Sequence, residues 1–188
     1  MNQINTRYHS MQIGEVILGS FRGKLCLLDF VKGKTRGTVE DRIRQVLNAE
    51  LVEQDDEILR ETSRQLNEYL EGQRKVFDIP VLMVGTDFQK SVWNELMKVP
   101  YGATSTYSQI ARDIGKERAV RAVGNAMGAN PIAIIIPCHR IVGSDGTLVG
   151  YGGGLSLKRR LLTLEHRNAS TPGTDPGAHR RIEEGHRG

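Results

Sequence analysis

The stretch PIAIIIPCHR, residues 131–140, decides how the rest of the chain is arranged. Its apolar and β-branched run is too short for a stable buried helix, so it predicts an extended segment inside a core. Pro137 ends the run, because proline fixes its own φ and holds the residue before it extended. We therefore expect Cys138 on a stiff turn, where a nucleophile can be held in place.

A cysteine beside a histidine is a weak signal when it stands alone. Side chains of sequence neighbours often point apart, so Cys138 and His139 do not by themselves establish a thiolate-generating pair, and a buried inert thiol is the commoner case. Cys26 lies within the apolar run LCLL, residues 25–28, and is expected to pack inside a strand. Two distant cysteines without a CxxC pair argue against a zinc site or a disulfide framework.

Composition indicates a soluble protein with room for one or two small domains. The 188 residues are 38% hydrophobic and 26% charged, with a mean hydropathy of −0.38. No apolar run is long enough to cross a membrane, and the N-terminus MNQINTRYHS lacks the layout of a signal peptide. We therefore expect a cytoplasmic protein without a membrane partner. A net charge of +4 permits a polyanionic partner without requiring one.

Residues 1–82 have the pattern of a small α/β domain. Two apolar runs, 13–18 and 25–31, flank the sequence RGK at 22–24, which is typical of a β-hairpin. Residues 55–70 carry apolar side chains at helical spacing. No acidic cluster here is spaced to bind a catalytic metal, so neither a metal nor another cofactor is expected.

Residues 83–167 have the pattern of a mostly helical domain. The sequence TxxQ occurs at 86–89 and at 106–109, and each copy is a potential capping box that predicts a helix start. Gly115 ends the second, short helix, and a longer helix is predicted over 117–128. A short helix, a glycine turn and a longer helix form the outline of a helix-turn-helix.

The helix predicted over 117–128 has two unlike faces. One side is apolar, whereas the other carries small or cationic residues, namely Arg118, Arg121, Ala122, Asn125 and Ala129. Small side chains allow another surface to approach the backbone closely. A DNA minor groove with Arg121 reaching into it fits that need, and a tight helix–helix contact would fit it as well.

The end of the chain contains a glycine-rich loop, a helix and a polar tail. The loop GYGGG at 150–154 matches no nucleotide-binding motif, but its glycines let backbone amides approach a flat ligand. Leucines at helical spacing predict a helix over 155–165. Residues 168–188 are rich in glycine, proline and polar side chains and are expected to form a disordered tail.

Five motifs occur in one order along the chain: RAVGNAM at 121–127, NP at 130–131, PCHR at 137–140, GY at 150–151 and GGL at 153–155. Together they resemble the O6-alkylguanine-DNA alkyltransferases, also called methylated-DNA–protein-cysteine methyltransferases. The resemblance runs without a gap from about Gly85 to Glu165 and is weaker before it. It implies a ribonuclease-H-like α/β domain, then a mostly α domain with a helix-turn-helix, winged-helix-like DNA-binding element.

The resemblance implies DNA repair by irreversible transfer of an alkyl group to Cys138. The group would come from O6-alkylguanine, and from O4-alkylthymine, in duplex DNA, and each molecule would act once as a suicide enzyme. His139 is implied as the base that takes the thiol proton, and Glu165 as the carboxylate that fixes the histidine tautomer. Tyr107 is implied as the proton donor to the leaving guanine.

Base flipping is implied too, because an alkylated base inside a duplex is out of reach. Arg121 would fill the vacated stack, and Asn130 would tie its helix to the buried strand. The other residues implied at the site are Arg118, Ala122 and Asn125 on the DNA face, and Met127, Arg140, Ile141, Tyr151, Gly152 and Lys158 in or near the pocket. Lys158 is equally compatible with a solvated lysine. Some relatives carry a serine at Gly152, so we expect a roomier pocket that accepts larger O6 substituents.

Other classes of function are compatible with parts of the sequence. A DNA-binding sensor without chemistry would share the helix and the pocket, but its relatives replace the cysteine. A regulator that signals by methylation would usually add a zinc-binding cysteine cluster, which this chain lacks. A Cys-His hydrolase would turn over an acyl substrate and need no DNA. A monomer is expected, with cooperative binding along DNA left open.

Overall fold

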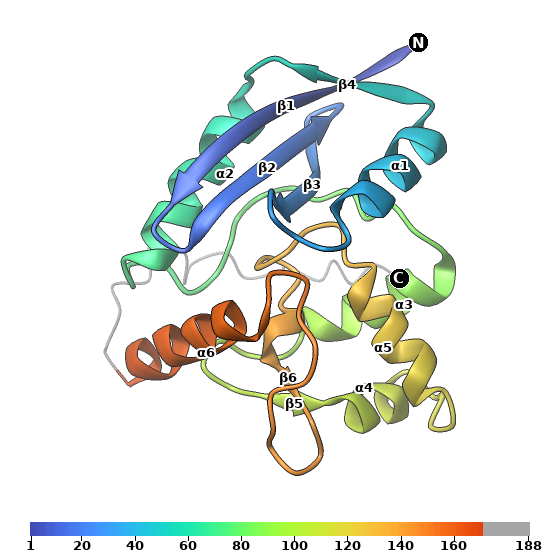
Figure 1. Ribbon diagram of the computed structural model, residues 1–188, viewed down its shortest axis with the longest axis vertical. Helices are drawn as coiled ribbons and strands as arrows, with labels where there is room; N and C mark the ends of the chain where they lie inside the picture. Colours follow the sequence, from blue (N-terminus) through green and yellow to red (C-terminus); the bar gives the residue numbers. More distant parts are fainter. Residues whose placement is uncertain (171–188) are drawn as a thin grey trace, which may run out of the picture.

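The computed structural model of the chain describes residues 1–170. A four-stranded sheet in the order β3-β2-β1-β4 fills one half of the molecule, and a group of helices fills the other (Figure 1). β1 (Asn2–Met11) pairs antiparallel with β2 (Gly14–Phe21), and β2 pairs antiparallel with β3 (Lys24–Phe30). β4 (Ala49–Glu53) runs parallel to β1. The β2–β3 pairing confirms the hairpin predicted from the sequence.

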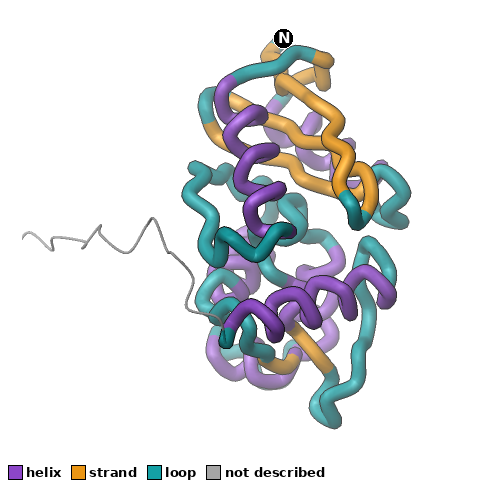
Figure 2. The backbone as a smooth tube through the Cα atoms, turned by 90° about the vertical axis from the view of Figure 1, so that its left-hand side faces the viewer, coloured by secondary structure: helices purple, strands orange, loops and turns teal. Residues whose placement is uncertain are grey.

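Two helices, α1 (Arg36–Leu47) and α2 (Glu57–Leu70), cover opposite faces of this sheet, which lies between them (Figure 2). Because successive side chains of a strand point to opposite faces, Ile17 of β2 packs with α1 whereas Leu18 packs with α2. α2 was predicted and begins at its cap, where the Asp56 carboxylate accepts a hydrogen bond from the Leu59 amide at 3.0 Å.

The helical half contains four α-helices and a short parallel ladder. Its elements are α3 (Asp87–Leu96), β5 (Ser105–Thr106), α4 (Tyr107–Asp113), α5 (Val120–Gly128), the 3₁₀ helix Cys138–Arg140, β6 (Ile141–Val142) and α6 (Leu155–Ala169). The capping box at Thr86 is complete. At Thr106 only half forms: its hydroxyl accepts from the Gln109 amide at 3.1 Å, while the Gln109 side chain binds Arg112 and Asp113 instead.

Two predicted boundaries are corrected. α5 begins at Val120 rather than at residue 117, so Arg118 lies in the turn before the helix. α6 continues to Ala169, and its last turn packs closely against Gly102. A Cβ added at Gly102 would lie only 2.5 Å from the Ala169 methyl carbon. The disordered tail predicted over 168–188 is therefore wrong for 168 and 169, and residues 171–188 lie outside the described part of the chain.

Residues 131–136 are buried as predicted, but they do not form a strand. Ile132 makes an isolated bridge to Leu28 at the edge of β3, and the chain then turns, with Ile134 at φ 69°. A β-branched residue rarely adopts a positive φ, so the surrounding core must hold it there. A short apolar run has the same pattern in a buried strand and in buried turns, which is why the sequence did not distinguish them.

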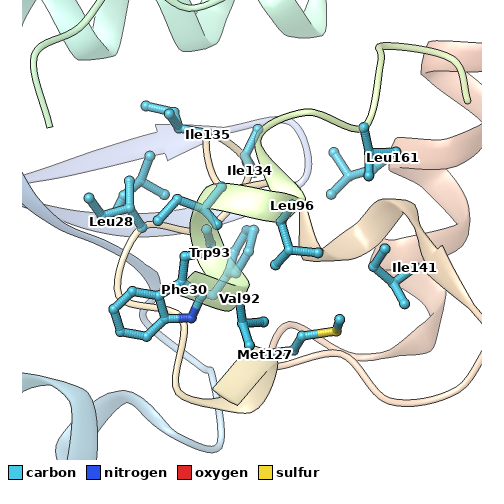
Figure 3. Packing of buried hydrophobic residues seen from close by; sticks show 14 of the residues in the cluster. Leu28, Phe30, Val92, Trp93, Leu96, Met127, Ile134, Ile135, Ile141 and Leu161 are labelled. Atoms are coloured by element: carbon cyan, nitrogen blue, oxygen red, sulfur yellow. The ribbon is translucent and has the colours of Figure 1, made fainter. Parts of the chain in front are cut away.

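The two halves share one hydrophobic core. Leu28 and Phe30 of β3 lie in the same cluster as Trp93 of α3 and Met127 of α5 (Figure 3). The Trp93 indole also donates a hydrogen bond to the Ala126 carbonyl at 2.8 Å, which joins α3 to α5. None of the helices within residues 1–170 is long and apolar enough to cross a membrane.

Candidate active site

Cys138 is the first residue of the 3₁₀ helix and is partly exposed, whereas the next residue, His139, is fully buried. Asn130, just after α5, holds the cysteine in position. Its amide nitrogen donates to Cys138 Sγ at 3.2 Å and to the Ile136 carbonyl at 2.9 Å, and its oxygen accepts from the Ile132 amide at 2.9 Å. The end of α5, the buried segment and the sulfur atom are thus fixed relative to one another.

Glu165 of α6 has none of its surface exposed and contacts the two residues that follow the cysteine. His139 Nε2 lies 2.8 Å from its Oε1, and the Arg140 guanidinium donates to both carboxylate oxygens at 2.9 Å. The Tyr69 hydroxyl donates at 2.7 Å and the Gly102 amide at 3.3 Å. Burial alone would raise the pKa of Glu165, but the hydrogen bonds from His139 and Arg140 outweigh it and lower the pKa to about 2.

This carboxylate determines which histidine nitrogen can act as a base. Because the ionised Glu165 is an acceptor, Nε2 of His139 carries the proton. Nδ1 is then the unprotonated nitrogen, and it is buried with no hydrogen-bond partner among residues 1–170. Burial lowers the pKa of His139, which favours the neutral ring with Nδ1 unprotonated.

Burial raises the pKa of the Cys138 thiol, and two side-chain interactions work against this. They are the hydrogen bond from Asn130 and the positive charge of Lys158. The Lys158 side chain is fully buried and donates to the carbonyls of Val149 and Gly150 at 3.0 and 3.2 Å. A solvated Lys158, which the sequence left open, is therefore wrong. Burial lowers the pKa of Lys158 itself.

A pocket opens beside Cys138. Residues from both halves line it: Lys34, Thr35, Tyr107, Gly124, Met127, Gly128, Cys138, Gly150, Tyr151 and Gly152. Met127, Tyr151 and Gly152, which the resemblance implied in or near the pocket, are among these lining residues. Ile141, whose backbone was expected near the pocket, is not among these lining residues; it pairs with Ser105 in the β5–β6 ladder and its side chain is fully buried.

Tyr107, the first residue of α4, lines the same pocket. Its hydroxyl donates to the Val149 carbonyl at 2.7 Å. Burial raises the pKa of Tyr107, and the nearby Cys138 raises it further, so the phenol keeps its proton. Tyr107 and Lys158 therefore hold the same carbonyl in the loop that walls the pocket.

Four of the five residues predicted on the DNA face of the helix are exposed, whereas Ala129 is partly buried and its carbonyl accepts a hydrogen bond from Arg42. Arg121, Ala122 and Asn125 are exposed, and Arg118 is exposed in the turn before the helix. The opposite side of α5 packs into the core through Val123, Ala126 and Met127. The alternative of a helix–helix contact on the small-residue face is therefore wrong for the described part of the chain.

Sequence reasoning missed three residues that the first half contributes to the site: Tyr69, which binds Glu165, and Lys34 and Thr35, which line the pocket. Tyr69 belongs to the predicted apolar stripe of α2. Nothing in that pattern indicates that its hydroxyl faces a carboxylate 96 residues later in the chain.

Comparisons with known proteins agree with this geometry. Residues 87–167 match the family described as 6-O-methylguanine DNA methyltransferase, DNA binding domain, and residues 6–83 match its ribonuclease-like domain. A methylated-DNA–protein-cysteine methyltransferase of Methanosarcina barkeri is 49% identical over 156 residues, which cover 83% of this chain and 93% of the relative. An inducible one of Bacillus subtilis is 52% identical over 120 residues, covering 64% of this chain and 67% of the relative.

Solved structures give the same result. The crystal structure of Mycobacterium tuberculosis OGT in complex with DNA superposes with a TM-score of 0.74 at 37% identity, covering 88% of this chain and 94% of that one. Fold, cysteine site and matches together define a transferase whose acceptor is a cysteine of the protein itself. The chain belongs to the 6-O-methylguanine DNA methyltransferase family, and the resemblance stated from its motifs is confirmed.

Proposed function

We propose that the protein repairs DNA by moving an alkyl group from O6 of guanine to Cys138 Sγ, once per molecule. The carbon–sulfur bond forms as the carbon–oxygen bond breaks. The thiol proton passes to Nδ1 of His139 through a water molecule, and Tyr107 protonates the ring of the departing guanine. One observation supports this most strongly: the partly exposed sulfur adjoins the pocket, above a buried histidine whose other nitrogen is bound to Glu165.

Lys158 and Glu165 have complementary parts in this proposal. Lys158 stabilises the thiolate electrostatically, because its charge lowers the pKa of Cys138. Glu165 keeps Nε2 of His139 protonated and stabilises the imidazolium that forms after proton transfer. Tyr107 must exchange its bond to the Val149 carbonyl for one to the base. Proton transfer on both sides of the reacting carbon lowers the barrier without a cofactor.

Duplex DNA is the proposed partner, with α4 and α5 as a helix-turn-helix. The exposed small side chains of Ala122 and Asn125 let α5 enter the minor groove, and Arg121 occupies the place of the flipped base. Residues 83–167 form the reacting domain, and residues 1–82 form a supporting domain of ribonuclease-H-like shape. The protein acts as a monomer in the cytoplasm, where a free thiol persists.

Intact mass after mixing with a duplex containing O6-methylguanine tests the function. We expect the mass of one methyl group in place of one proton, located on Cys138, and no further gain with excess DNA. Cys138→Ser should show no gain. Cys26→Ala is the matched control and should react normally, because burial raises the pKa of Cys26 to about 12 and keeps it protonated.

The alternative functions predict other results, in this assay or in an ester-cleavage assay. A sensor without chemistry would bind the duplex and keep its mass. A Cys-His hydrolase would cleave an activated ester repeatedly without DNA, and either result would contradict alkyl transfer. Repeated turnover of methylated DNA by one molecule would contradict the single-use part of the proposal.

A further inference from the structure

The turn between β3 and α1 forms part of the wall of the pocket. In Figure 1 this loop faces the helical half of the molecule. Its residues Lys34 and Thr35 line the cavity together with Cys138 and the glycine-rich loop. All pocket residues expected from the sequence lie in the helical half of the molecule. Lys34 and Thr35 come from the half that contains the sheet, and no sequence motif indicates that they line the pocket.

Thr35 stands at the cap position of α1 but does not cap the helix. A threonine at this position normally accepts a hydrogen bond from an amide of the first turn. Thr35 instead has φ −104° and ψ −1°, and its side chain makes no capping bond. Its hydroxyl has no hydrogen-bond partner among residues 1–170, so donor and acceptor are both available beside the pocket.

The position of this hydroxyl relative to Gly152 is informative. A Cβ added at Gly152 would lie 3.6 Å from Thr35 Oγ1, which is ordinary van der Waals contact. Glycine supplies no side-chain hydroxyl at position 152, whereas Thr35 brings one to the same side of the pocket. Of the two tyrosines that line the pocket, Tyr107 donates its hydroxyl to the Val149 carbonyl, and the hydroxyl of Tyr151 is buried.

α1 is anchored so that Thr35 stays in place. Two turns along the helix, Arg42 donates to the Ala129 carbonyl at 2.7 Å and to the Val84 carbonyl at 3.2 Å. Its guanidinium lies 5.6 Å from the centre of the Trp93 ring. Ala129 ends α5 and precedes Asn130, which holds Cys138. The helix that carries Thr35 is thus tied to the element that positions the sulfur atom.

We infer that Thr35 is a substrate-binding residue for the alkyl transfer: its hydroxyl forms a hydrogen bond with the O6-alkylguanine base in the pocket. This inference rests on the proposed function. Removal of the hydroxyl leaves the base atom that it binds without this partner, so it is expected to lower the rate with every O6-alkylguanine, whatever the substituent.

The test compares Thr35→Val, which keeps the shape and removes the hydroxyl, with Thr35→Ser, which keeps the hydroxyl. The second-order rate constant for alkylation of Cys138 is measured with an O6-methylguanine duplex and with the free base O6-benzylguanine. We expect Thr35→Val to slow both reactions about three- to tenfold. Thr35→Ser and the control Thr38→Val, an exposed threonine of α1, should react like the unmodified protein.

Thermal unfolding of the same variants shows whether the effect is merely structural. Because Thr35 makes no capping bond, Thr35→Val should leave the Tm unchanged. Adding a hydroxyl next to it, as Gly152→Ser in the Thr35→Val background, should restore part of the rate.

Three outcomes would overturn the inference: an unchanged rate for Thr35→Val, a loss with duplex DNA alone, or an equal loss for Thr35→Ser. In each of these outcomes Cys138 of the unmodified protein is still alkylated. If Cys138 of the unmodified protein is not alkylated, the proposed function itself is refuted.

Discussion

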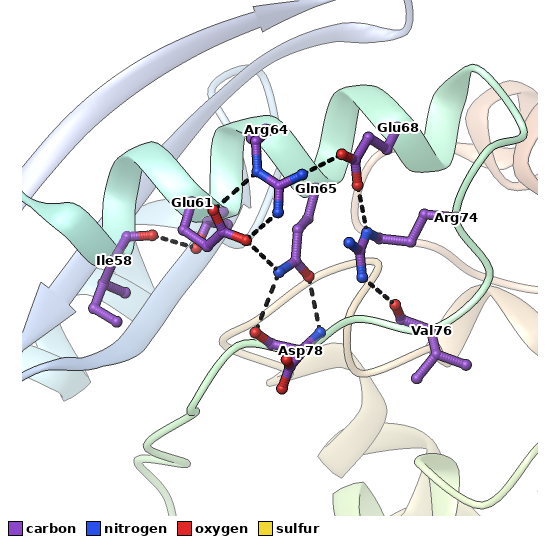
Figure 4. A network of polar contacts seen from close by, with 9 residues as sticks. Ile58, Glu61, Arg64, Gln65, Glu68, Arg74, Val76 and Asp78 are labelled. Atoms are coloured by element: carbon purple, nitrogen blue, oxygen red, sulfur yellow. Dashed lines mark hydrogen bonds and ion pairs between the residues drawn. The ribbon is translucent and has the colours of Figure 1, made fainter. Parts of the chain in front are cut away.

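Two networks of carboxylates and arginines in this protein differ in their exposure to water. On the outer face of α2, Arg64 bridges Glu61 and Glu68, and Arg74 adds a second contact to Glu68 (Figure 4). Under the pocket, Glu165 binds Arg140 and His139. The side chains of Arg64 and Glu61 are 54% and 37% exposed, whereas those of Glu165 and His139 are fully buried.

The pKa values alone would make these networks look alike. Hydrogen bonds from Arg64 and Gln65 lower the pKa of Glu61 to about 2, and the pKa of Glu165 is also lowered to about 2. Water screens the exposed network, so its contribution to stability is small. In the buried network each charge has lost its hydration and depends on its partners. The comparison teaches that burial, rather than the number of contacts, makes a network critical.

Glu165→Gln is expected to have the largest effect. It leaves Arg140 as an unpaired buried cation and should lower the free energy of unfolding by about 3 to 5 kcal/mol. Alkyl transfer should slow as well, since a neutral amide replaces the carboxylate that fixes the tautomer of His139 and stabilises its imidazolium. Urea unfolding and the rate of Cys138 labelling measure the two effects. Glu68→Gln on α2 is the control, and equal losses from both variants would remove the contrast.

Asp29 sharpens the comparison because it is a buried carboxylate without an arginine contact among residues 1–170. Its Oδ2 has no hydrogen-bond partner within this range, and burial raises its pKa from 3.8 to about 6 although the Phe30 amide donates to it. Because the pKa of Asp29 is raised in the folded state, its protonated carboxyl contributes fully to the free energy of unfolding below about pH 4. This contribution is lost as the pH rises through about 6.

Asp29→Asn should therefore be more stable than the unmodified protein at about pH 8, by roughly 2 to 3 kcal/mol, with the difference vanishing near about pH 4. Urea unfolding at several pH values measures it. A difference that does not change with pH would show that the carboxyl does not titrate in the fold.

Tyr69→Phe should change the free energy of unfolding less than Glu165→Gln or Asp29→Asn. It removes one of several donors to Glu165 and leaves the His139 and Arg140 contacts in place. We expect a loss of about 1 to 2 kcal/mol in the free energy of unfolding. The rate of Cys138 labelling should stay close to that of the unmodified protein. A rate as low as that of Glu165→Gln would make Tyr69 part of the proton relay instead of a support for it.

The smallest effect is expected for Arg64→Ala, which removes both of its surface contacts at once. The urea midpoint should change little at low salt and less at high salt, because ions screen exposed pairs. A large, salt-independent loss would show that the α2 network is coupled to the sheet beneath it.

Several elements could be predicted because their signals are local. The caps at Asp56 and Thr86 and the β2–β3 hairpin depend on neighbouring residues. β1 and α1 carried no comparable signal: in α1 only Val39 and Ile43 are buried, and β1 has an irregular apolar pattern. Both elements are stabilised by packing against partners distant in the chain.

The sequence by itself determined the family and indicated the candidate reacting residue, because Cys138, His139 and the spaced motifs around them are read directly in order. It also indicated that residues 131–136 are buried. Only the tertiary structure decided how that segment turns, that Lys158 is buried, and that Tyr69 and Thr35 reach the site from the other half. Such contacts join atoms far apart along the chain, and no periodicity or motif encodes a distance that only folding creates.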